Sequence, residues 1–216
     1  MTTCALVAAS DFNADHFKAL NDAGGFDYIV AVDAGFAYLE KLGVKPDLAI
    51  GDFDSLGYVP KARRVSKHPQ HKDQSDLELA LERVSTRRYS HVHVYGALGG
   101  RLDHTLANLQ LFASYAEQGF DITAIDMDCA LRVLVGPDAF DLPPFKSGTI
   151  SVFSATDVSY GVSERGLEYP LDDADLTNRT SLGLSNELIG QEAAVSVAEG
   201  TLYVFYPLAD SAAVSE

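Results

Sequence analysis

Two patterns of hydrophobic and polar positions divide the chain. Through residue 127, short apolar runs alternate with segments whose apolar positions repeat at helical spacing. The runs predict buried strands at Cys4–Ala9, Tyr28–Asp33, Leu48–Asp52, His91–Ala97 and Ile122–Met127. The helical spacing predicts helices at Ala14–Ala23, Gly35–Leu42, Ser75–Val84 and Asp103–Glu117. Such alternation is typical of a parallel sheet with helices on both faces.

The pattern changes near residue 131. From there the apolar runs are short, rich in β-branched residues, and separated by Gly, Pro, Asp and Asn, which predicts an antiparallel sandwich or barrel. The expected strands are Leu131–Val135, Thr149–Phe153, Val195–Ala198 and Thr201–Tyr206. We therefore predict two domains. An α/β domain over residues 1–130, with a mostly parallel sheet and flanking helices in a Rossmann-like arrangement, precedes an all-β sandwich domain over residues 131–216.

Length and charge narrow the classes of function. A chain of 216 residues is long enough for two small domains. Lys and Arg total 16 against 31 Asp and Glu, a formal net charge of −15, which argues against a dedicated nucleic-acid-binding protein. The acidity suits a cationic substrate or a divalent metal, and equally a protein kept soluble by its charge. The N-terminal segment does not resemble a signal peptide, and no apolar run approaches the about 18 residues of a membrane span. We expect a cytoplasmic protein.

Four polar clusters lie where predicted strands end or helices begin. They are Asp33-Ala34-Gly35, Gly51-Asp52-Phe53-Asp54-Ser55, Asp73-Gln74-Ser75-Asp76 and Gly99-Gly100-Arg101-Leu102-Asp103-His104. Because the carboxyl ends of parallel strands meet at one edge of a sheet, these clusters are expected to converge on a single crevice.

The acidic members of these clusters suggest a metal site. Asp52 and Asp54 point to one side if their segment is extended, and close carboxylates are costly unless a cation lies between them. Mg²⁺ takes oxygen ligands and usually shares them with phosphates and water. Asp33 is a weaker candidate, because Asp-Ala-Gly is also a common turn sequence.

The remaining polar residues suit a phosphate. Ser75 and Asp76 can cap the following helix, whose N-terminus is an anion site. Gly99 and Gly100 allow close approach of the backbone to a ligand, and Arg101 offers a planar, permanently charged fork. Ser75 and Asp76 alone are equally compatible with a simple cap, and Gly-Gly-Arg alone is a weak signal; their joint occurrence in this order favours phosphate chemistry.

Together these motifs resemble those of the thiamine pyrophosphokinase family. The resemblance continues in the second half, over Gly166-Leu167-Glu168-Tyr169-Pro170-Leu171 and Ser181-Leu182-Gly183-Leu184-Ser185-Asn186-Glu187. It implies an α/β catalytic domain followed by a β-sandwich, and transfer of pyrophosphate from ATP to the hydroxyl of thiamine with release of AMP. It also implies Mg²⁺ and a homodimer in which each active site lies between the α/β domain of one subunit and the sandwich of the other.

The resemblance also assigns roles to residues. It implies that Asp52, Asp54 and Asp76 hold the metal and the phosphates, and that Ser75, Arg101 and Asp103 complete the catalytic crevice. Nucleotide contacts are expected from Asp33, Gly99, Gly100 and Asn108, and thiamine contacts from Tyr169, Ser185 and Asn186. The chain departs from the family at Ser75, where Thr is usual, and at Tyr169, where Trp is common. A tyrosine keeps an aromatic face for a cationic ligand, though a smaller one.

Three other functions fit parts of this pattern. A related diphosphokinase acting on another alcohol, such as a hydroxymethylpterin, would use the same crevice with a different second domain. An aspartyl-phosphate phosphatase would explain the Asp52–Ser55 segment. A non-catalytic sensor of thiamine or a nucleotide would keep the pocket without turnover.

Overall fold

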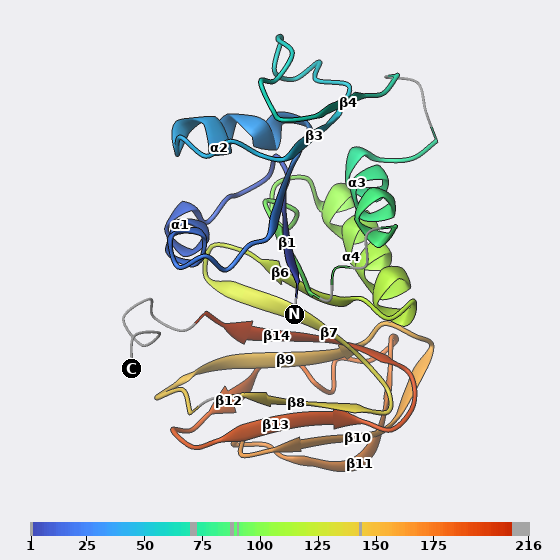
Figure 1. Cartoon of the computed structure of the whole chain (residues 1–216). Helices are drawn as coiled ribbons and strands as arrows, with labels where there is room; N and C mark the ends of the chain where they lie inside the picture. The colour runs from blue at the N-terminus through green and yellow to red at the C-terminus, as the bar shows by residue number, and fades with distance from the viewer. Residues whose placement is uncertain (1, 70–72, 87–88, 90, 143, 209–216) are drawn as a thin grey trace. The chain divides into compact units, whose positions relative to one another are not determined.

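The computed structural model describes residues 2–69, 73–86, 89, 91–142 and 144–208 (Figure 1). The chain forms two compact units. The first holds the residues up to Leu111 together with Phe120–Met127, and the second holds Phe112–Gly119 and the residues from Asp128 onward. None of the helices in the described part of the chain has the length and hydrophobicity of a membrane-spanning helix.

The strands of the first unit pair in parallel. Their spatial order is β6 (Asp121–Ile125), β5 (His91–Tyr95), β1 (Thr3–Val7), β2 (Tyr28–Val32), β3 (Leu48–Gly51) and β4 (Val65–Lys67). Every residue of β3 is buried, as are four of the five residues in β1 and in β2. Burial on both faces explains why these strands appear in the sequence as continuous apolar runs.

Helices cover this sheet. They are α1 (Ala14–Asp22), α2 (Phe36–Lys41), α3 (Asp76–Ser85) and α4 (Leu102–Glu117), with a 3₁₀ turn, η1 (Asp33–Gly35), before α2. In Figure 1, α1 and α2 lie on one side of the strands and α3 on the other. The side chain of Asn13 caps α1 and that of Ser75 caps α3, so polar residues in the sequence set where both helices begin.

The order of the strands creates a switch point beside β1. The chain leaves β1 for β2, β3 and β4 on one side, and later adds β5 and β6 on the other. At such a point the connections leave the sheet in opposite directions, which opens a crevice at the carboxyl ends of the two central strands.

The second unit contains two antiparallel groups of strands. One has the order β12 (Asn186–Leu188), β9 (Gly148–Ser154), β14 (Thr201–Pro207) and β7 (Cys129–Val135). The other has the order β11 (Leu171–Thr177), β10 (Val158–Arg165), β13 (Ala193–Val197) and β8 (Asp138–Leu142). Inward side chains of both groups, such as Ile150, Leu202, Val162 and Val195, pack into one core.

The structure confirms a mixed α/β fold with a mostly parallel sheet and a separate antiparallel sheet. It also contains strands that the apolar pattern does not predict: β4, β8, β10, β11 and β12. In β11 the three aspartates Asp172, Asp173 and Asp175 are exposed, and they interrupt the apolar run by which a strand is recognised in the sequence. Strand β4 is a three-residue edge strand with little buried surface.

Candidate active site

A cavity of about 340 Å³ lies at the carboxyl edge of the parallel sheet, within the first unit. Its walls come from the segment after β1, the end of β2, the start of α3, and the segment from β5 into α4. Seven of the residues predicted from the sequence line it: Asp33, Ser75, Asp76, Gly99, Gly100, Arg101 and Asn108.

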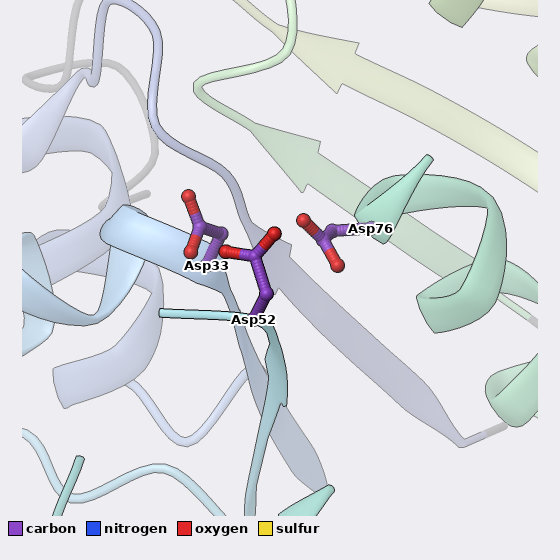
Figure 2. Close-up of side chains that lie close together, drawn as sticks. All are labelled: Asp33, Asp52 and Asp76. Carbon is purple, nitrogen blue, oxygen red and sulfur yellow. The ribbon is translucent and has the colours of Figure 1, made fainter. Parts of the chain in front are cut away.

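Three carboxylates converge at this edge. Asp33 begins η1 directly after β2, Asp52 follows β3, and Asp76 is the first residue of α3. One oxygen of each lies within 4.8 Å of the others, and Figure 2 shows the side chains pointing toward one another. Three carboxylate oxygens at this spacing form a donor set that suits a hard divalent cation such as Mg²⁺.

Backbone geometry holds Asp33 in this group. The residue has a positive φ of 47°, and its Oδ1 accepts a hydrogen bond of 3.1 Å from the backbone N–H of Phe53. A Cβ on Gly35 would lie 2.0 Å from the carbonyl oxygen of Val7, so only glycine fits that turn. Burial, together with the nearby Asp76 and Asp52 carboxylates, raises the pKa of Asp33 above its ordinary value. Asp33 therefore belongs to the carboxylate group as well as to a turn.

Asp54 lies outside this group of three. Its prediction assumed an extended segment, but Phe53 has a φ of 62°, which turns the chain between Asp52 and Asp54. The Asp54 carboxylate accepts a hydrogen bond from the Ser55 hydroxyl, and its backbone N–H donates to Asp52 Oδ1 at 3.0 Å. The structure thus brings Asp33, rather than Asp54, together with Asp52 and Asp76.

Other residues that line the cavity suit phosphate oxygens. The Ser75 hydroxyl accepts from the backbone N–H of Glu78 at 3.1 Å, leaving the other N–H groups of the first turn of α3 beside the cavity. Gly99 and Gly100 both have positive φ, and a Cβ on Gly100 would lie 2.8 Å from Ser10 Oγ. Asn108 Nδ2 donates to the carbonyl of Ala97 at 2.7 Å and so anchors the segment after β5.

Arg101 and Asp103 form an exposed, two-bonded ion pair. Arg101 Nη2 lies 2.6 Å from Asp103 Oδ2, and Nε lies 3.1 Å from Oδ1. The hydrogen bond from Arg101 is the main reason that the pKa of Asp103 falls to about 2. While the pair persists, Asp103 holds the guanidinium in place and is a weak proton acceptor.

Two polar side chains that line the cavity, Ser10 and His104, were not among the predicted site residues. Ser10 follows the first predicted strand, Cys4–Ala9. The expectation that polar residues after parallel strands converge at one edge of the sheet therefore applies to Ser10 as well. The place of His104 in the wall depends on the direction of α4, which the sequence alone does not reveal.

A second pocket, of about 540 Å³, lies in the second unit. It contains all three residues expected to contact thiamine. Tyr169 is 63% exposed, and Ser185 has a strained positive φ of 59°. Asn186 is buried and its side-chain amide bonds to neighbouring protein groups. The rest of the lining was not predicted and includes Leu182, Leu184 and Glu164.

A parallel α/β sheet that brings three carboxylates, a helix N-terminus and a glycine pair to one edge, beside a cavity, is typical of proteins that bind phosphorylated ligands with a divalent metal. Comparison with known proteins narrows this class. A family model described as thiamin pyrophosphokinase, catalytic domain, matches residues 23–124, and one described as thiamin pyrophosphokinase, vitamin B1 binding domain, matches residues 141–202.

Similar proteins and solved structures indicate the same family. Thiamine pyrophosphokinase of Bacillus subtilis (strain 168) is 30% identical over 181 residues, which are 80% of this chain and 84% of that protein. A crystal structure of the B. subtilis thiamine pyrophosphokinase matches with a TM-score of 0.81 and 26% identity, over 97% of this chain and 100% of that one. Yeast thiamin pyrophosphokinase shares the fold, with a TM-score of 0.74 at 12% identity over 95% of this chain and 86% of that one. The chain belongs to the thiamine pyrophosphokinase family.

Proposed function

We propose that this protein transfers a pyrophosphoryl group from ATP to the hydroxyl of thiamine, giving thiamine pyrophosphate and AMP. One observation carries the proposal: the carboxylates of Asp33, Asp52 and Asp76 converge beside the cavity that also holds Gly99 and Gly100. This arrangement occurs in a chain whose second half matches a vitamin B1 binding domain.

The reaction makes one bond and breaks another. The thiamine hydroxyl oxygen bonds to the β-phosphorus of ATP, the bond from that phosphorus to the α,β-bridging oxygen breaks, and AMP leaves. The chain contributes positioning and charge, which dominate catalysis of phosphoryl transfer. In this proposal Arg101 and the first turn of α3 bind phosphate oxygens, and the glycine pair lets the backbone approach them closely.

The proposed metal is Mg²⁺, held by Asp33, Asp52 and Asp76. A bound Mg²⁺ supplies charge neutralisation on the phosphate oxygens. The sequence-based assignment of Asp54 as a further ligand stays a prediction. So does the choice between Asp54 and Asp103 as acceptor of the hydroxyl proton.

We propose that thiamine binds at the second pocket. Tyr169 presents an exposed ring suited to the cationic thiazolium, and Ser185 presents a hydroxyl. We further propose a homodimer in which the α/β domain (residues 1–130) of one subunit and the sandwich (residues 131–216) of the other form each active site. The family resemblance supports this assembly, and the exposed apolar side chains of Leu182 and Leu184 beside the pocket suit burial against a partner. A cytoplasmic location stays a prediction from the sequence.

The test is incubation of the purified chain with ATP, MgCl₂ and thiamine, followed by chromatography. Thiamine pyrophosphate and AMP are expected in equal amounts, and EDTA should stop their formation. Asp52→Asn protein, purified in the same way, controls for contaminating kinases.

Other outcomes point to the rival functions. Transfer to a hydroxymethylpterin but not to thiamine would identify a related diphosphokinase. Binding of both ligands without AMP would identify a sensor, and a labile acyl-phosphate on the protein would identify a phosphatase.

A further inference from the structure

The side chain of Asn186 has no free hydrogen-bonding capacity. Its Nδ2 donates to Glu164 Oε2 and to the carbonyl of Tyr169, both at 2.7 Å. Its Oδ1 accepts from the backbone N–H groups of Tyr169 at 3.0 Å and of Glu187 at 2.9 Å. A primary amide has two N–H donors and one oxygen with two acceptor sites, so all four are used. In this structure, Asn186 therefore bonds entirely within the protein.

These bonds fix the backbone of Tyr169. Asn186 bonds to both its N–H and its carbonyl, as a neighbouring strand would. Two further contacts hold the same segment: Leu167 forms a β-bridge with Leu188, and the Glu168 N–H donates to the carbonyl of Glu187 at 3.0 Å. The ring of Tyr169 projects from this fixed backbone into solvent at the second pocket. The position of the ring thus depends on Asn186.

Glu164 in turn holds Asn186. It lies on β10, has no exposed surface, and lines the second pocket. One carboxyl oxygen, Oε2, accepts from Asn186, whereas Oε1 is buried without a hydrogen-bond partner among the described residues. A buried acid with an unsatisfied oxygen is costly, and an apolar residue would fill a sandwich core at lower cost. The acceptor that Glu164 offers to Asn186 is the gain that offsets this cost.

Ser185 adds strain to the same segment. It directly precedes Asn186, its φ of 59° lies in the left-handed region, and its N–H donates to Ser151 Oγ at 3.0 Å. A strained residue persists only where its surroundings hold it, and the four bonds of Asn186 provide that support on one side.

We propose that Glu164 is a positioning residue for thiamine recognition: through Asn186 it fixes the backbone of Tyr169, and with it the aromatic ring at the second pocket. Only the identity of the ligand in this inference rests on the proposed function. The role assigned to Glu164 is that of a hydrogen-bond acceptor and not of a charge, so an amide at the same position preserves it.

Two substitutions of Glu164 distinguish a role as a hydrogen-bond acceptor from a role as a charge. Glu164→Gln keeps an oxygen for Asn186 and is expected to retain the wild-type KM for thiamine. Glu164→Leu removes the acceptor and is expected to raise that KM about tenfold, the effect of one net hydrogen bond, with kcat and the KM for ATP changed less than about twofold. Glu192→Leu, at an exposed position of the same unit, is the matched control and should match the wild type.

A second measurement needs no ligand. The Tyr169 amide donates to Asn186, so its hydrogen exchange should accelerate in Glu164→Leu and stay at the wild-type rate in Glu164→Gln. Should Glu164→Leu fail to fold by circular dichroism, Glu164→Met, which also lacks an acceptor, takes its place.

Several results would overturn the inference. One is an unchanged hydrogen-exchange rate of the Tyr169 amide in Glu164→Leu. Another is an unchanged KM for thiamine in Glu164→Leu when the wild-type enzyme is active. A third is an equal rise in the KM for thiamine in Glu164→Gln and Glu164→Leu, which would indicate a role for the charge of Glu164. Failure of the proposed function looks different. The wild type would form no thiamine pyrophosphate, while the exchange difference between Gln and Leu would remain.

Discussion

At the scale of single residues, the three clustered carboxylates oppose folding when no metal is bound. Asp33, Asp52 and Asp76 bring like charges within 4.8 Å of one another, and the raised pKa of Asp33 reflects both burial and that repulsion. A site arranged for a ligand commonly costs stability in the ligand's absence.

Asp33→Asn should therefore separate stability from activity. Asparagine keeps the Oδ1 acceptor for the Phe53 N–H and removes one charge, so the variant should unfold in EDTA at a Tm equal to or above that of the wild type. It should also lose at least about 100-fold in turnover and lose the rise in Tm that MgCl₂ gives the wild type. Thermal unfolding with and without MgCl₂ measures both effects.

Asp54→Asn provides the comparison. Asp54 lies outside the group of three, so this variant is expected to keep the Mg²⁺-dependent rise in Tm. If Asp54→Asn loses that rise and Asp33→Asn keeps it, the metal site is the one predicted from the sequence and not the one inferred from the structure.

Glu164 should leave a signature in the pH dependence of stability. Burial raises the pKa of Glu164 above its ordinary value of 4.5. As the pH rises above 4.5, the unfolded chain releases this proton first, while the folded chain retains it up to its higher pKa. The folded state then binds more protons, so the contribution of Glu164 to stability falls with rising pH across that window. Glutamine has no proton to lose at this position, so Glu164→Gln should gain stability relative to the wild type from pH 4.5 upward.

Urea unfolding at pH 4, 6 and 8 tests this expectation. Exposed Glu192→Gln serves as the control, and its difference from the wild type should not depend on pH in the same way. Parallel pH curves for the wild type and Glu164→Gln would show that the carboxyl titrates normally in the folded state.

At the scale of elements, helix α3 links stability to the cavity. Its cap, Ser75, accepts the N–H of Glu78, and its first residue, Asp76, belongs to the carboxylate group. Ser75→Ala should cost about 1 kcal/mol of unfolding free energy and also weaken nucleotide binding. Ser75→Thr restores the hydroxyl and should recover both, as measured by urea unfolding and by ATP titration. Loss of ATP affinity with no loss of stability would mean that Ser75 contacts the ligand without capping the helix.

The apolar pattern predicts the elements that are buried on both faces or along one helical stripe, such as β1 and α3. It fails where a strand presents acids to solvent, as β11 does with three aspartates, or where an edge strand is short, as β4 is. In those strands, backbone pairing with neighbours decides the structure, and that pairing depends on residues distant in sequence.

The residues of the site also divide into those that the sequence predicts and those that only the structure identifies. Asp52, Asp76 and Arg101 could be found because each follows a recognisable strand or begins a helix. The membership of Asp33 depends on a turn at Phe53, and the role of Asn186 depends on Glu164, which lies 22 positions away on another strand. Both facts require the three-dimensional structure.

At the scale of the whole molecule, the proposed dimer makes a quantitative prediction. If each active site combines the α/β domain of one subunit with the sandwich of the other, two inactive variants should complement each other. Asp52→Asn subunits and Tyr169→Ala subunits, each nearly inactive at low thiamine, should on mixing and exchange recover about one quarter of wild-type activity. Half of the randomly mixed dimers are hybrid, and each hybrid has one intact site of two.

Size-exclusion chromatography with light scattering provides the accompanying measurement. A monomer, or a dimer that exchanges subunits without any recovery of activity, would place both residues of each site in the same chain.

The ion pair between Arg101 and Asp103 has one further consequence. The Asp103 carboxylate bonds to the guanidinium of Arg101 in the way a phosphate would, so in the proposed complex ATP has to displace it. The hydrogen bond from Arg101 is the main cause of the low pKa of Asp103, about 2, so a phosphate that replaces Asp103 on Arg101 is expected to raise this pKa. We therefore expect nucleotide binding, in the proposed reaction, to turn Asp103 from a partner of Arg101 into a stronger base.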